Sequence, residues 1–299
     1  MAITENETCH FGNMKEGKLA ILAISKNKSC HIQIILYLIL CRTCHFRTVV
    51  LKYWYMKVMP IIFSYKDVKD LYPSRNGFNS FLKRSLKNGK IKQIKKGLYA
   101  LVDPSTGGIY ASRFQIASHL FDDAYFSYHE ALEYYGLATQ VFVSRFTYLT
   151  HVYVRDMDFE DVIYQSKKSD CDLEILNQMA EEDTRVVSLE RAIVDSIDNP
   201  GYAGGLEEVE NALAACRDLY IDKVIKMLEY YDKAFLYQKV GYLFEKYFGN
   251  RVPESFYELC LSRSGNKIQY FEAKVGYAKL VLKWKLMVPI ERDLPDDIF

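Results

Sequence analysis

The side chains best suited to chemistry lie in a basic stretch between residues 71 and 102, which contains eight Lys or Arg and no Asp or Glu. Amides and hydroxyls stand among these cations. Cations bind phosphate oxygens, while amides and arginines also hydrogen-bond base edges in the grooves of DNA. The stretch therefore predicts contact with double-stranded DNA. A solvated basic face without a partner is the alternative.

A helix and a β-hairpin are expected to position these side chains. The apolar spacing predicts a helix from about Gly77 to Asn88, with its polar residues on the opposite side. Two short strands, Ile91 to Ile94 and Leu98 to Leu101, follow around a turn at residues 95–97. The apolar side of the helix comprises Phe78, Phe81, Leu82, Ser85 and Leu86.

This order predicts a winged helix-turn-helix whose helix enters the major groove. Ser64 and Asp67 predict a short helix through Leu71, and either Val49 to Met59 or Pro60 to Phe63 would form the first helix of the motif. Candidate base readers are Arg75, Asn76, Asn79, Ser80 and Lys83. Candidate phosphate contacts are Lys87, Lys92, Lys95 and Lys96, and Arg84 is a further candidate DNA-binding residue. About five neutralised phosphates would give a log–log salt slope of about −4 to −5.

Charge divides the chain into blocks. Counting Lys and Arg against Asp and Glu gives +5 for residues 1–57, +8 for 58–102 and −12 for 103–299, although the formal net charge is only +1. We expect a poorly structured or mis-assigned extension at 1–57, the DNA-binding domain at 58–103 and a larger domain at 104–299. The predicted fold class is α+β, with an N-terminal winged helix-turn-helix and a mixed, mainly helical C-terminal domain.

The first 57 residues contain a separate set of possible ligands. Cys41-Arg42-Thr43-Cys44-His45 matches the haem-attachment pattern, and the same residues with His31 could bind zinc, but chance composition is favoured over both. The apolar run from Ile32 to Cys41 is too short to cross a bilayer and lacks a cleavage site. We expect translation to begin at Met56 or Met59. Seven scattered cysteines favour reduced thiols in the cytoplasm.

Beyond a polar linker at 103–108, the pattern predicts mostly helices. The expected helices span residues 109–121, 127–136, 188–197, 206–219, 221–230, 234–247 and 254–261. The expected strands span residues 141–144, 152–154, 162–164, 268–271 and 279–283. In the helix at 188–197, Arg191 and Asp195 are four residues apart beside Glu190, which predicts an ion-paired structural signature.

No catalytic motif stands out. The carboxylates between Asp156 and Asp161 could hold Mg²⁺, although a solvated acidic loop is favoured. His129-Glu130 lacks the second histidine of a zinc-protease helix, so His129 is expected to pack or cap. Phosphate loops, dinucleotide fingerprints and nucleophile elbows are missing. We therefore expect a protein that is not an enzyme and needs no cofactor.

Four segments resemble a known family. They are KKGLYAL (95–101), AYFSYHEALEYYGL (124–137), SLERAIVDSI (188–197) and KVGYLFE (239–245). In this order they resemble the AbiEi-type antitoxins and transcriptional regulators of type IV (abortive infection) toxin–antitoxin systems. The resemblance implies a winged helix that binds operator repeats in its own promoter, and a C-terminal domain that opposes a nucleotidyltransferase-like toxin.

The expected function is therefore a cytoplasmic, DNA-binding autorepressor that acts as an antitoxin. Its expected partners are double-stranded operator DNA and a nucleotidyltransferase-like toxin, with no membrane. Two alternatives stay open: a plain regulator without a toxin, and a metal-assisted nucleic-acid enzyme that uses the Asp156 to Asp161 carboxylates. A monomer that reads two repeats and a dimer that reads one palindrome are equally compatible with the sequence.

Overall fold

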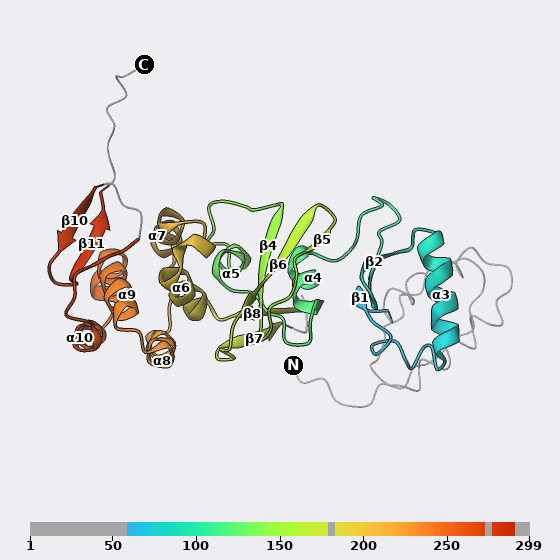
Figure 1. The fold of residues 1–299 in the computed structure, drawn as a ribbon, viewed down its shortest axis with the longest axis horizontal. Helices are drawn as coiled ribbons and strands as arrows, with labels where there is room; N and C mark the ends of the chain where they lie inside the picture. The colour runs from blue at the N-terminus through green and yellow to red at the C-terminus, as the bar shows by residue number, and fades with distance from the viewer. Residues whose placement is uncertain (1–58, 179–182, 273–276, 291–299) are drawn as a thin grey trace, which may run out of the picture. The chain divides into compact units, whose positions relative to one another are not determined.

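The computed structural model describes residues 59–178, 183–272 and 277–290, and it divides the chain into two units at Met59/Pro60. The described residues form a mixed α+β fold with eight α-helices and several small sheets, which confirms the expected class (Figure 1). The extension at 1–57, with its Cys/His ligands and apolar run, lies outside the described residues. So does most of the proposed first helix, Val49 to Met59.

The first elements of the second unit are a helix and a small antiparallel sheet. Strands β1 (Ile62–Phe63), β2 (Ile91–Lys95) and β3 (Leu98–Leu101) pair in the order β1-β3-β2, and helix α3 (Arg75–Lys87) lies beside β2 (Figure 1). The expected helix and hairpin are therefore present. The helix begins two residues earlier than expected because the Ser74 hydroxyl accepts a hydrogen bond from the Gly77 amide at 3.1 Å.

The segment before α3 differs from the prediction. Residues 65–71 form turns rather than a helix, and Pro60 to Phe63 contains β1 rather than a helix. The Asp67 carboxylate accepts hydrogen bonds from both the Ser64 amide and the Ser64 hydroxyl, at 2.7 and 2.8 Å. These bonds close a local turn, and Pro73 follows before a second helical turn could form.

Two short helices begin the next part of the chain. Helix α4 (Arg113–His119) starts with a capping box between Ser112 and Gln115. It begins later than expected because Ile109 forms a β-bridge with Val102. Helix α5 (Tyr128–Tyr134) follows the predicted position. Gly136, which ends it, has a φ of +71° that favours glycine.

A mixed sheet follows these helices along the chain. β4 (Arg145–Thr150) is parallel to β6 (Val162–Lys168), and β5 (Met157–Phe159) is antiparallel to β6. β7 (Ile175–Gln178) and β8 (Thr184–Val187) form a second ladder. Tyr125 bridges to Leu149, and Phe126 bridges to Val186. These two residues therefore connect the ladders through backbone hydrogen bonds.

The strands expected at 141–144 and 152–154 are loops. Their apolar side chains are exposed, with Val143 at 72% and Tyr153 at 73%. The strand lies between them, at β4, where Phe146, Tyr148 and Leu149 are buried. β-branched composition alone therefore misplaced both strands.

Five helices follow. They are α6 (Leu189–Asp198), α7 (Leu206–Ala215), α8 (Ile221–Tyr231), α9 (Ala234–Tyr247) and α10 (Glu254–Arg263). Helix α6 contacts α5, α7, α8 and α9, and its residues from Glu190 to Ile197 are all buried. A helix enclosed on every side is the centre of a core. Among the described residues, no helix is both long and apolar enough to cross a membrane.

The last sheet packs on this helical core through one face. β9 (Gln269–Tyr270), β10 (Ala278–Val281) and β11 (Leu286–Pro289) pair in the order β10-β11-β9. Leu286 and Val288 are buried. On the opposite face, Leu280, Met287 and Tyr270 are register partners across the three strands, and Leu280 and Tyr270 are 41% and 57% exposed. This second face is apolar and uncovered by the described residues.

Candidate nucleic-acid interface

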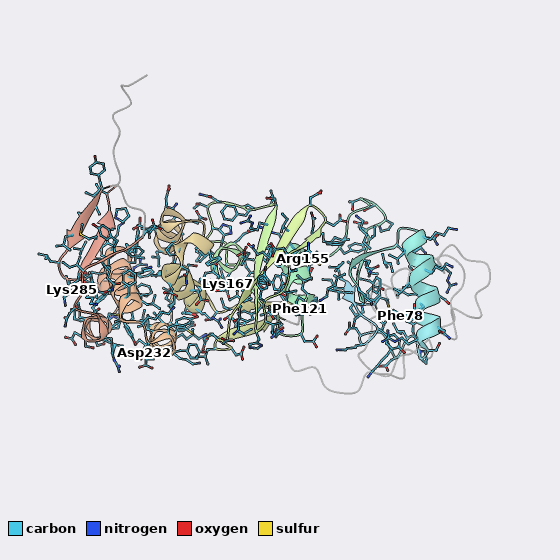
Figure 2. All side chains as sticks on the ribbon, viewed as in Figure 1. Phe78, Phe121, Arg155, Lys167, Asp232 and Lys285 are labelled. Atoms are coloured by element: carbon cyan, nitrogen blue, oxygen red, sulfur yellow. The ribbon has the colours of Figure 1, made fainter. Side chains whose placement is uncertain are left out.

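Helix α3 presents cations and amides on one outward face. Phe78, Phe81, Leu82 and Ser85 are buried against the small sheet and fix the rotation of the helix. Figure 2 labels Phe78 on the side of α3 that faces the strands. The candidate residues on the helix are all exposed: Arg75, Asn76, Asn79, Ser80, Lys83, Arg84 and Lys87. Leu86, expected on the apolar side, is 39% exposed at the margin of this face.

The charges of this face are not neutralised locally. Within the part of the chain that the structure describes, no carboxylate lies within 4.0 Å of the side-chain nitrogens of the four α3 cations. The Arg75 guanidinium lies 4.2 Å from the centroid of the Tyr65 ring, and the Arg84 Nε donates to the Ser80 carbonyl at 3.3 Å. Four cations on a 13-residue helix are therefore available to an anionic partner.

The hairpin lysines differ from one another. Lys96 is exposed, but Lys92 Nζ lies 2.7 Å from Glu160 Oε1. Lys95 Nζ donates to the Leu120 carbonyl and lies 3.7 Å from the centroid of the Phe121 ring. Burial lowers the pKa of Lys95. The structure thus brings the α3 residues together on one face, and it gives Lys92 and Lys95 partners within the chain.

Two further residues belong to this surface. Lys90 is exposed between α3 and β2, where its backbone bonds to Ser85 and Val102. Lys90 is one of the eight cations of the acid-free stretch but was not among the candidate DNA contacts. Tyr65, which supports Arg75, could not be identified because the contact depends on the fold of the turn.

A hollow of about 350 Å³ lies next to the Lys95 contact. Its walls include Lys66, Asp67, Asp122 and Arg185. Both cations and carboxylates line it, so the hollow favours neither anionic nor cationic ligands.

The acidic residues 156–161 occupy one hairpin. Asp158 is on β5, and Glu160 and Asp161 form the two-residue turn between β5 and β6, with φ values of +51° and +62°. Asp156 Oδ2 accepts a hydrogen bond from Gln165 at 3.3 Å. Among the described residues, no three His, Cys, Asp or Glu side chains converge as metal ligands.

The remaining candidates form buried contacts. Arg191 Nε lies 3.3 Å from Asp195 Oδ2, which confirms the expected ion pair, and Asp195 also accepts hydrogen bonds from Ser127 and Tyr231. Glu190 accepts a hydrogen bond from the Tyr220 amide at 3.1 Å. His129, 1% exposed, lies 3.1 Å from the Gln140 carbonyl and packs on Phe142. These residues hold helices together.

Comparisons with known proteins concern the fold. No protein-family model and no curated protein matches the chain. The fold is similar to the crystal structure of the RV2827C protein from Mycobacterium tuberculosis, with a TM-score of 0.53 and 13% identity over 77% of this chain and 86% of that chain. At this identity the similarity extends to the fold alone.

Proposed function

We propose that the chain is a DNA-binding transcriptional autorepressor whose residues 58–103 contain the reading helix, α3, and the wing of a winged helix-turn-helix. The observation that carries the proposal is the outward face of α3, where four cations that pair with no carboxylate of the described residues stand beside Asn76 and Asn79. A 13-residue helix is about 20 Å long, which suits the major groove. The adjacent β2–β3 hairpin is the wing, and its pairing with β1 joins it to the segment that precedes α3.

The second half of the proposal is that the chain acts as the antitoxin of a type IV system, with residues 104–299 as the domain that opposes a nucleotidyltransferase-like toxin. The sequence resemblance in four ordered segments supports this half. Three of these segments contribute to α5, α6 and α9, so they specify the core of the C-terminal part rather than a site. Buried free thiols at Cys171, Cys216 and Cys260 suit the cytoplasm in which such a protein would act.

The DNA-binding half is tested by measuring the affinity of the full chain for the DNA upstream of its own gene. Lys83→Ala removes a candidate base reader and should weaken binding by about 1–3 kcal/mol, with relaxed sequence preference. Lys87→Ala removes a candidate phosphate contact and should weaken binding to all sequences alike, with a salt slope smaller by about 1.

Lys267→Ala is the matched control. Lys267 is exposed, and its replacement removes the same charge from a loop near the C-terminal sheet. Equal affinity for the control and for both α3 variants would contradict the assigned face. The antitoxin half is tested by co-expression with the adjacent nucleotidyltransferase-like gene, where rescue of growth is expected. Repression without rescue would leave a plain regulator.

A further inference from the structure

Two of the wing's cations are already held by other parts of the same unit. Lys92 pairs with Glu160 at 2.7 Å, 68 residues away along the chain, and each side chain of the pair is 38% exposed. Lys95 reaches the Leu120 carbonyl and the face of the Phe121 ring. Lys66, on the turn before α3, lies 3.7 Å from Asp122. The β2–β3 hairpin and the turn before α3 therefore contact the body of the unit, meaning the described residues from 104 onward, at several points.

The carboxylate that meets Lys92 is held at the tip of a strained turn. Glu160 and Asp161 connect the register partners Phe159 and Val162, and both have positive φ values. Such two-residue turns favour Asn, Asp and Gly, because longer side chains are strained there. Asp161 suits its position, but Glu160 does not. The ion pair between Glu160 and Lys92 of the basic hairpin gives a reason for the glutamate.

A carboxylate oxygen and a DNA phosphate oxygen bind a lysine ammonium in the same way. They therefore compete for Lys92. The pair is partly exposed, so its strength is modest and DNA can displace it. A different contact keeps Lys95 away from DNA. The Leu120 carbonyl oxygen and the face of the Phe121 ring replace water around its ammonium.

We propose that Glu160 and the Leu120–Phe121 segment form an intramolecular latch, in which an acidic turn takes the place of DNA phosphate on the wing. This inference rests on the proposed DNA-binding function. The closed latch holds Lys92 and Lys95 and leaves the α3 face available, so DNA first meets α3 and then takes the wing from the latch. The body thereby reduces the affinity of the DNA-binding domain for DNA.

The first test needs no DNA. Glu160→Gln removes the charge of the latch and keeps its shape, and Asp158→Asn on the same hairpin is the matched control. Lysines of the full chain are acetylated with an amine-reactive ester and quantified by mass spectrometry. Lys92 should become about two- to fivefold more reactive in Glu160→Gln, as expected for the loss of a partly exposed ion pair. Lys90 is the internal reference and should be unchanged in both variants.

The second test measures affinity for a short mixed-sequence DNA duplex at low salt. Glu160→Gln should bind about two- to fivefold more tightly than the wild type, and Asp158→Asn should gain less. Lys92→Ala should weaken binding more in the Glu160→Gln background than in the wild type. In the wild type, the gain from the Lys92–phosphate contact is partly offset by the loss of the Lys92–Glu160 pair.

The two proposals fail in different ways. If Lys87→Ala binds the duplex as well as the wild type does, the DNA-binding function is wrong, whatever the effect of Glu160→Gln. If Lys87→Ala loses binding while Glu160→Gln matches Asp158→Asn in both lysine reactivity and affinity, the latch is wrong and the DNA-binding function stands.

Discussion

Glu130 is a carboxylic acid enclosed in the core, in the first turn of α5. It is 4% exposed, and its Oε1 accepts a hydrogen bond from the Thr147 amide at 2.7 Å. Among the described residues no group bonds to its Oε2. Burial raises the pKa of Glu130 from 4.5 to about 7, against the smaller opposing effect of the Thr147 hydrogen bond. The folded protein therefore binds a proton here that the unfolded chain releases at lower pH.

This proton makes stability depend on pH. The stabilisation from Glu130 is present in full below about pH 4.5 and is lost as the pH rises through about 7, because the folded state holds the proton more tightly. The loss amounts to about 3 kcal/mol. Glu130→Gln should remove this dependence and be more stable than the wild type at pH 8, as measured by urea unfolding at several pH values. Glu258→Gln, an exposed change on α10, should leave the wild-type pH profile intact.

At the scale of elements, α9 and the C-terminal sheet pack closely because Gly241 has no side chain. A Cβ on Gly241 would overlap the six-membered ring of Trp284, which is 1% exposed and donates from its Nε1 to Glu245 at 2.6 Å. Gly241→Ala should therefore destabilise the protein by about 1–3 kcal/mol or more, because a buried ring must move. Thermal unfolding measures the effect. Gly201→Ala adds the same methyl group in open space, so an equal loss in both variants would contradict the packing argument.

The sequence predicted the helices better than the strands, for physical reasons. The expected bounds of α9 are the observed ones, and α8 differs by one residue, because long amphipathic repeats identify a helix without tertiary context. The strand β8 was missed because its four residues, Thr184–Val187, are too few for a period to show. The ranges 141–144 and 152–154 have strand-like composition but make no ladder.

The candidate interface was predictable in part. The exposed side of α3 follows from helical periodicity alone, so every polar residue assigned to it is on the surface. The partners of Lys92 and Lys95 depend on Glu160 and Leu120, which are 68 and 25 residues away along the chain. No local pattern reports contacts over such separations. The DNA contacts themselves stay a prediction.

At the scale of the whole molecule, charge of one sign is concentrated in residues 58–102, at +8, and charge of the other sign in 103–299, at −12. Under the proposed DNA-binding function, counterion release governs affinity. We then expect about five neutralised phosphates, so the log of the DNA association constant should fall against log salt with a slope of about −4 to −5. Fluorescence anisotropy titrations at several KCl concentrations measure it. A slope near zero would rule out phosphate contacts as the source of affinity.

The row of Leu280, Met287 and Tyr270, which the described residues leave uncovered, has a practical consequence for handling the protein. Environment-sensitive dyes that fluoresce on apolar surfaces should bind the native state there, so melting curves recorded with such dyes will start from a raised baseline. Replacing Leu280 and Tyr270 with Lys should lower that baseline. The retention of this variant on a hydrophobic column should then change only when the protein unfolds.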